Sequence, residues 1–269
     1  MRRRLSMKSK KLSIPYIIWM VIFTMIPLVM IGFTAFTDKS GNFSFEPFTK
    51  AFEYTGVFTK SLWIALLSTV ICLVLAYPLA YMITKMKRST QRTVIMLLMI
   101  PMWMNFLLRI YAWMILLQDN GPIDTALSLL GIHGKYINNT GAVIIGMVYE
   151  YLPFMVLPIY TVMSKIDSGL IEAAQDLGSN GVDVFRKVIF PLSIPGIISG
   201  ITMVFVPSAS TFLVAQYLGG TGDIMIGDII DMYFRTDQNL AAALSLVLMV
   251  FIFIFLVIMN LFGDEEAIA

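Results

Sequence analysis

The sequence is short of charged residues and contains one cysteine and one histidine. Lys, Arg, Asp and Glu make up 13% of the 269 residues, whereas hydrophobic residues make up 58%. A soluble domain carries about a quarter charged residues, so this chain has too little charge to cover a surface that faces water. We therefore predict an integral membrane protein. The lone Cys72 excludes a disulfide framework.

The sequence also lacks the motifs of several catalytic and metal-binding classes. It has no Gly-x4-Gly-Lys-Ser/Thr run with which to bind and hydrolyse ATP. An intramembrane serine protease needs a Gly-x-Ser-Gly turn and a membrane-embedded histidine, whereas His133 lies in a predicted loop. Met96, Met99 and Met102 have Met-x-x-Met spacing but occupy an apolar run, where methionine is ordinary filling. We expect no catalytic residue, metal, cofactor or nucleic acid on this chain.

Six stretches are long and apolar enough to cross a bilayer, whose ~30 Å hydrocarbon core needs ~20 helical residues. They cover residues 14–36, 61–84, 93–117, 141–163, 188–217 and 240–262. The predicted fold class is therefore all-α and integral to the membrane, with six transmembrane helices. The fifth stretch is longer than a span requires and contains Pro191, Pro195 and Pro207. We expect an interfacial turn at its start and a kink inside it.

Lysine and arginine concentrate on one side of this six-span domain (14–262). They lie in the N-terminal segment 1–13 and in the loops after the second and fourth stretches. Cytoplasmic loops carry this excess, so segment 1–13 and the tail 263–269 are predicted to be cytoplasmic, in a multi-pass protein of the plasma or inner membrane. The opposite side has more acids than bases. This is either a field that attracts a cation or a by-product of the same bias.

The loop between the fourth and fifth stretches, residues 166–187, has the pattern of a short charged helix. Asp167 or Ser168 can cap its start, and Gly178 suits its end. A helix that lies on the membrane surface would carry more Lys and Arg and a larger apolar face, so we favour insertion into a groove of a cytoplasmic protein. The apolar residues on one face are Leu170, Ala174 and Leu177.

The same loop resembles the signature loop of permease subunits of binding-protein-dependent ABC importers. That pattern is Glu-Ala-Ala, three residues, Gly, nine residues and Ile-x-Leu-Pro. The matching residues are Glu172, Ala173, Ala174 and Gly178, followed by Val188-Ile189-Phe190-Pro191, in which Val and Phe replace Ile and Leu. The resemblance implies a type I importer permease fold, in which this loop is a cytoplasmic coupling helix that fits a cleft of an ATPase. It assigns ATPase coupling to Glu172, Ala173, Ala174, Gly178 and Pro191.

Three further stretches extend the resemblance over nearly the whole chain. "PMWMNFLLRIYAW" (101–113), "VIIGMVYEYLPFMVLPIY" (143–160) and "FPLSIPGIISG" (190–200) are similar to the first permease subunit of spermidine/putrescine importers. The resemblance implies a polyamine uptake complex of two permeases, two ATPase subunits that hold ATP and magnesium, and an extracellular binding protein. This chain would form half of the pore. The alternatives are an ABC importer permease for another small solute and, on composition alone, a secondary transporter or channel.

A polyamine needs carboxylates for its ammonium groups, aromatic faces for cation–π contacts and apolar walls for its methylenes. At ~1.5 Å per residue, Arg109 and Glu150 lie ~12 and ~13.5 Å from the outer ends of their predicted spans. Antiparallel neighbours would place them at similar depth, either as a structural ion pair or with Glu150 facing the substrate. The candidate substrate-path residues are Trp103, Asn105, Arg109, Tyr111, Tyr149, Glu150, Tyr160 and Asp223.

Overall fold

A computed structural model describes residues 14–266 of the chain. Within this range every regular element is helical, apart from an isolated bridge between Thr37 and Phe43, so the all-α prediction is confirmed. The predicted cytoplasmic segment 1–13 and the last three residues of the predicted tail lie outside the described residues.

The elements follow one another as helices of very different length. In chain order they are α2 (Ile14–Met20), η1 (Val21–Met25), α3 (Ile26–Ala35), α4 (Glu46–Phe52), α5 (Thr55–Thr84), α6 (Arg88–Met99), η2 (Ile100–Trp103), α7 (Phe106–Leu117), α8 (Pro122–Ser128), α9 (Thr140–Met163), α10 (Ser168–Asp176), α11 (Gly181–Val184), η3 (Phe185–Ile189), α12 (Phe190–Ser210), α13 (Leu213–Leu218), α14 (Ile226–Thr236) and α15 (Gln238–Glu266). Elements η1 and η3 are π-helical turns, and η2 is a 3₁₀ turn.

Five helical runs among the described residues are long and apolar enough to cross a membrane, and a bent pair makes up to six. The bent pair replaces the continuous third span that we predicted over 93–117. Its two parts, Arg88–Trp103 and Phe106–Ser128, are inclined by 92°. The prediction of a single span over 93–117 did not include this break, at which extended backbone at Met104 separates η2 from α7. Asn105 then caps α7 by accepting a hydrogen bond from the Leu107 N–H at 2.9 Å.

The fifth span also differs from its prediction. Instead of an interfacial turn before residue 190, a continuous helical run covers Gly181–Ser210. The π-helical turn η3 shifts the hydrogen-bond register, and this accommodates Pro191, which has no N–H to donate. The run ends at Thr211 in extended backbone, and α13 follows as a separate short helix.

The described chain divides into two compact units. The first contains the residues up to Thr55 together with Ile229–Val250. In this unit the Asn239 side chain donates hydrogen bonds to the carbonyl groups of Thr34 and Thr37, at 3.1 and 2.8 Å. An ion pair of 3.0 Å joins Lys39 to Asp237. The end of α3 is thereby fixed to the start of α15.

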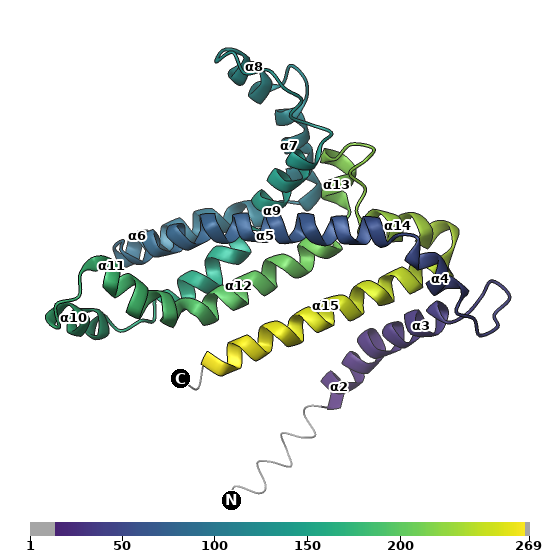
Figure 1. Cartoon of the computed structure of the whole chain (residues 1–269), viewed down its shortest axis with the longest axis horizontal. Coiled ribbons are helices and arrows are strands. Elements are labelled where there is room, and N and C mark those ends of the chain that lie inside the picture. The colour runs from purple at the N-terminus through teal and green to yellow at the C-terminus, as the bar shows by residue number, and fades with distance from the viewer. Residues whose placement is uncertain (1–13, 267–269) are drawn as a thin grey trace, which may run out of the picture. The chain divides into compact units, whose positions relative to one another are not determined.

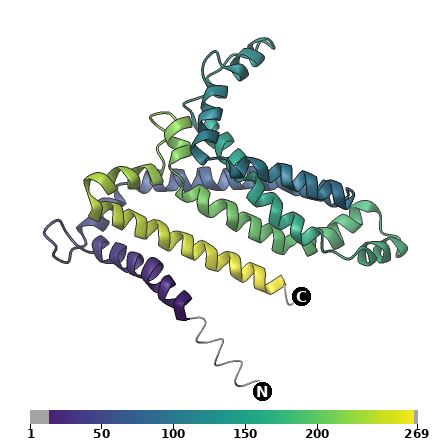
Figure 2. The same cartoon turned by 180° about the vertical axis from the view of Figure 1, so that it is seen from behind.

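The second unit contains Gly56–Asp228 and the residues from Phe251 onward. Its α9 and α12 lie side by side in both views, while α7 and α8 project away from them (Figures 1 and 2). A Cβ atom added to Gly200 of α12 would lie 2.6 Å from the Met155 sulfur, and one added to Gly196 would lie 3.0 Å from the Pro158 carbonyl oxygen. These two glycines, four residues apart, permit the close approach of membrane helices.

Candidate functional site

The loop that follows α9 folds into a capped helix, α10. Asp167 is its N-cap and accepts a hydrogen bond from the Gly169 N–H at 3.0 Å. Gly178 ends the helix with a φ of +84°, in the left-handed region that glycine adopts without strain. The N–H groups of Gly178 and Ser179 donate back to the carbonyls of Gln175 and Ala174, which satisfies the last turn in a Schellman arrangement.

A second capped helix follows directly. The Asn180 side chain accepts hydrogen bonds from the N–H groups of Val182 and Asp183, at 3.0 and 2.9 Å. An ion pair of 3.0 Å then joins Asp183 to Lys187. Elements α10 and α11 therefore form a two-piece knuckle (residues 167–187) in which each helix begins at a side-chain cap, while Phe185 packs against Tyr77 and Tyr81 of α5.

The knuckle presents apolar side chains to its surroundings. Leu177 is 89% exposed and Leu170 is 50% exposed. Glu172 and Ala173 are exposed beside them, and Ala174 is half-buried. A capped helix with an exposed apolar face suits a groove in another protein better than it suits water.

The two ionisable residues predicted at similar depth meet in the structure. The Nη1 atom of Arg109 on α7 lies 2.8 Å from Oε2 of Glu150 on α9. Their side chains are 10% and 2% exposed. The Arg109 guanidinium carbon also lies 5.7 Å from the centroid of the Phe106 ring, a cation–π distance.

The ion pair is a single contact of 2.8 Å, and neither carboxylate oxygen of Glu150 accepts a hydrogen bond from the described residues. Among the described residues, neither Nε of Arg109 nor Oε1 of Glu150 has a hydrogen-bond partner. Buried charged groups are normally paired and fully hydrogen-bonded, because their desolvation is costly. Glu150 thus keeps an unused acceptor oxygen that can receive a further donor.

Two aromatic pairs join α7 to its neighbours, one to α9 and one to α13. Trp113, one turn after Arg109 on α7, packs edge-on against Tyr149 with ring centroids 5.4 Å apart. Tyr111 packs against Tyr217 of α13 at 5.0 Å, with their hydroxyl oxygens 3.3 Å apart. The structure therefore brings Arg109, Glu150, Tyr149 and Tyr111 of the predicted path into one region around α7.

Three other predicted path residues are placed elsewhere. Trp103 is 82% exposed at the break between α6 and α7. Asn105 uses its side-chain oxygen to cap α7. Tyr160 lies ten residues beyond Glu150 on α9, or ~15 Å along the axis, and donates a hydrogen bond to Gln91 Oε1 at 3.0 Å.

The last predicted path residue, Asp223, is held in a polar clamp. It forms an ion pair of 2.8 Å with Lys60 of α5 and accepts hydrogen bonds from the Thr140 hydroxyl and the Gly220 N–H. Burial opposes ionisation of Asp223, but these donors outweigh it and hold its pKa below the ordinary value. Sequence reasoning did not identify Lys60 or Thr140. They lie 163 and 83 residues away, so no local pattern signals the contact.

Helices of membrane length, with a capped knuckle and a buried ion pair between them, define a multi-pass helical membrane protein. Residues 6–264 match the family of binding-protein-dependent transport system inner membrane components. The chain belongs to this family of ABC importer permeases, and it is a multi-pass inner-membrane protein.

Curated relatives refine the comparison. The chain is 36% identical over 244 residues to the spermidine/putrescine transport system permease protein PotB of Haemophilus influenzae, covering 86% of this chain and 85% of that protein. It is 37% identical over 227 residues to PotB of Escherichia coli, covering 80% and 82%.

Solved structures confirm the fold. A bacterial ABC transporter that imports the acidic polysaccharide alginate gives a TM-score of 0.81 at 17% identity, covering 98% of this chain and 99% of the other. The MetNI methionine ABC transporter gives 0.56 at 18% identity, covering 78% and 93%. The predicted type I permease fold is therefore confirmed.

Proposed function

We propose that this chain forms half of the translocation pore of an ATP-driven polyamine importer. The observation that carries the substrate class is the 36% identity, over 86% of the chain, to a permease named for spermidine and putrescine. A polyamine needs a carboxylate and aromatic faces, and Glu150 beside Arg109 and the aromatic pairs around α7 supply them. Oε1 of Glu150 is buried without a hydrogen-bond partner, so an ammonium group could pair with it only in a state in which the path opens beside α7 and α9. The rings of Tyr149 and Tyr111 would offer faces to the rest of the substrate.

The same proposal assigns the energy source to another chain. Two ATPase subunits would bind ATP and magnesium. One of them would bind the knuckle at Glu172, Ala173, Ala174 and Gly178. The capped backbone and exposed Leu177 support this, because a rigid knob transmits a displacement that a flexible loop would absorb. Pro191 lies in the first turn of α12, where the knuckle joins the membrane helix. A second permease and an extracellular binding protein complete the complex.

The proposed topology follows from the knuckle. If segment 166–187 meets a cytoplasmic ATPase, the N-terminal segment 1–13 and the tail 263–269 are cytoplasmic as well, with the permease domain 14–262 between them. Single-cysteine labelling tests this. In a Cys72→Ser background, a thiol at Asp176 should react only from the cytoplasmic side, and one at Leu129 only from outside. The reverse pattern contradicts the topology.

Transport by the reconstituted complex tests the substrate. Radiolabelled spermidine uptake into proteoliposomes should require ATP, the ATPase and the binding protein, and unlabelled putrescine should compete. Competition by neutral or acidic solutes, with no effect of polyamines, would favour an importer for another small solute. Uptake that persists without the ATPase would favour a secondary transporter or channel.

Co-purification tests the coupling assignment separately. Glu172→Lys should release the ATPase from a tagged permease, because it reverses an exposed charge in the centre of α10. Asp176→Lys makes the same charge change at the end of α10, at one of the three unspecified x positions of the Glu-Ala-Ala-x3-Gly pattern, and should retain most of the ATPase. If both variants retain the ATPase equally, the ATPase does not bind the permease at the knuckle.

A further inference from the structure

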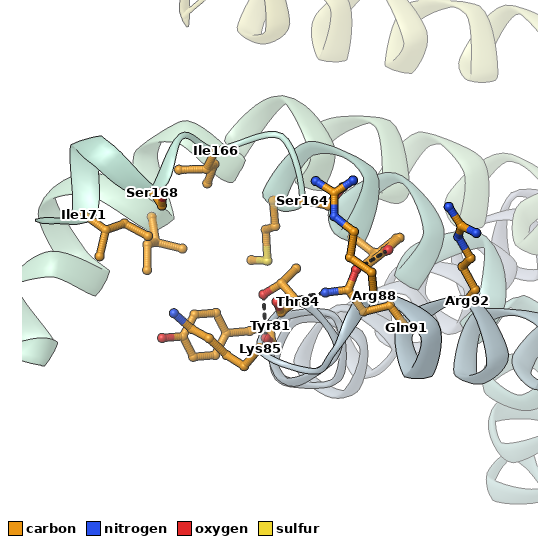
Figure 3. A pocket seen from close by; sticks show the side chains of 13 residues that line it. Tyr81, Thr84, Lys85, Arg88, Gln91, Arg92, Ser164, Ile166, Ser168 and Ile171 are labelled. Atoms are coloured by element: carbon orange, nitrogen blue, oxygen red, sulfur yellow. Dashed lines mark hydrogen bonds between the residues drawn. The ribbon is translucent and has the colours of Figure 1, made fainter.

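A basic cavity lies at the knuckle end of the second unit, apart from the ion pair and the clamp. Its volume is about 470 Å³. One wall comes from the end of α5 and the start of α6 and carries Lys85, Arg88 and Arg92. The facing wall comes from the end of α9 and the start of the knuckle and carries Ser164 and Ser168 (Figure 3).

The three cations of this cavity lack anionic partners. None of the ion pairs between residues of the described range 14–266 involves Lys85, Arg88 or Arg92. Lys85 instead lies over the ring of Tyr81, 5.1 Å from its centroid. Arg88 and Arg92 are one turn apart on α6, and both extend from the same side of that helix (Figure 3). A cavity with this charge repels a polyamine and attracts an anion.

Hydrogen bonds of Gln91 stabilise the walls of the cavity, and they do not involve Lys85, Arg88 or Arg92. The amide nitrogen of Gln91 donates to the carbonyls of Met86 and Thr84, at 2.9 and 3.1 Å, and so secures the turn between α5 and α6. Its amide oxygen accepts from the Tyr160 hydroxyl at 3.0 Å, which ties this turn to α9. The start of α6 also has no side-chain cap at Lys87, so its N-terminal N–H groups add positive potential.

The position of the cavity along the helices indicates where an anion comes from. Thr84 ends α5 and Met163 ends α9, and both helices have the length of a membrane span. The cavity therefore lies at the depth of lipid headgroups. Ile166, Ile171 and Ile189 add apolar lining suited to a glycerol backbone and the first acyl carbons.

We propose that this cavity binds the phosphate of an anionic phospholipid of the membrane leaflet that faces the knuckle. The phosphate would lie between Arg88, Arg92 and Lys85, and its oxygens would reach the Ser168 wall. Because Ser168 begins α10, the bound headgroup would hold the base of the knuckle against α6. Basic pockets between membrane helices recognise phospholipid headgroups in this way.

Lipid retention by the intact transporter tests the proposal. The full complex is placed in nanodiscs of phosphatidylcholine with one-fifth phosphatidylglycerol, and the phosphatidylglycerol that stays bound is counted by native mass spectrometry. The double variant Arg88→Gln, Arg92→Gln should lower the affinity roughly thirty-fold, since each basic residue near the surface contributes about a factor of five. The exposed pair Lys87→Gln, Lys165→Gln removes the same charge beside the cavity and is the matched control.

The outcomes distinguish a specific lipid site from diffuse attraction to the surface and from a site for soluble phosphate. Loss of bound phosphatidylglycerol in the arginine variant but not in the lysine control supports the proposal. Equal loss in both overturns it in favour of diffuse surface attraction. A third arm supplies inorganic phosphate at millimolar concentration to complexes in pure phosphatidylcholine. If native mass spectra show phosphate bound to the wild type but not to the arginine variant, and phosphate also displaces phosphatidylglycerol in the mixed nanodiscs, the ligand is a soluble phosphate and the lipid assignment is wrong.

Discussion

Replacing Glu150 by glutamine should destabilise the permease strongly, because it leaves the guanidinium of Arg109 buried without a counter-charge. Both side chains are at most 10% exposed. Removal of one partner of a buried pair costs about 3–5 kcal/mol, most of it from the charge left behind. A guanidinium cannot lose its proton in a protein, so Arg109 has no means of becoming neutral.

The opposite substitution should be milder. Arg109→Met leaves Glu150, and a carboxylate can take up a proton and become neutral, which a guanidinium cannot do. The double variant Arg109→Met, Glu150→Met removes both charges and replaces them with apolar chains of similar length. Such replacements are often neutral or stabilising, so it should be more stable than either single variant.

The assay combines unfolding in mixed micelles with transport by the same preparations. Unfolding free energies should rank the double variant above Arg109→Met, and Arg109→Met above Glu150→Gln. If the pair only holds the helices together, the double variant should recover uptake; if Glu150 contacts the substrate, it should be stable yet transport slowly. Single variants as stable as the wild type would refute the reasoning, as would a greater loss in Arg109→Met than in Glu150→Gln.

Three further predictions concern the other sites. The pKa of Asp223 is lower in the folded state, so its clamp with Lys60 stabilises the fold fully above pH ~4, and this stabilisation disappears as the pH falls through the folded-state pKa. In acid unfolding titrations, the difference in unfolding free energy between wild type and Asp223→Asn should therefore vanish. Gly200→Leu should separate α12 from α9, because its Cβ would lie 3.2 Å from the Met155 carbonyl oxygen, which cannot rotate away as the Met155 side chain can; intramolecular cross-linking yields between the two helices should fall. Gly178→Ala should lower the stability of the knuckle by about 1–2 kcal/mol, because alanine is strained in the left-handed conformation; no steric clash adds to this cost, since no atom lies within 4 Å of the new Cβ. Hydrogen exchange should show faster opening confined to the knuckle, and an unchanged rate would contradict this.

Local patterns in the sequence predicted the membrane helices and the knuckle well. Residues 141–163 were predicted as a span, and α9 covers Thr140–Met163. The sequence offered Asp167 or Ser168 as the N-cap of this helix, and the hydrogen bond from the Gly169 N–H identifies Asp167. These features depend on hydropathy, caps and glycine, which act within a few residues.

Features that depend on tertiary contacts were harder to predict. The break at Met104 was missed because an apolar run with one proline can be read as a kinked span. Counting residues from the span ends predicted that Arg109 and Glu150 lie at similar depth, and the structure brings them together as an ion pair. No such count related Lys60 to Asp223, since both lie outside the spans that were predicted over 61–84 and 188–217. Pro191 was predicted to mark a turn, and the π-helical turn before it carries the helix through instead.

The uninterrupted run from Gly181 to Ser210 has a mechanical consequence. Thirty residues of helix form a rod ~45 Å long, so a tilt of only about 5° at one end displaces the other by about 4 Å. The next segment, α13, carries Tyr217, which packs on Tyr111. Under the proposed coupling, a small displacement of the knuckle would therefore move the Ser210 end of this rod by about the size of a side chain, directly before the short helix that carries Tyr217.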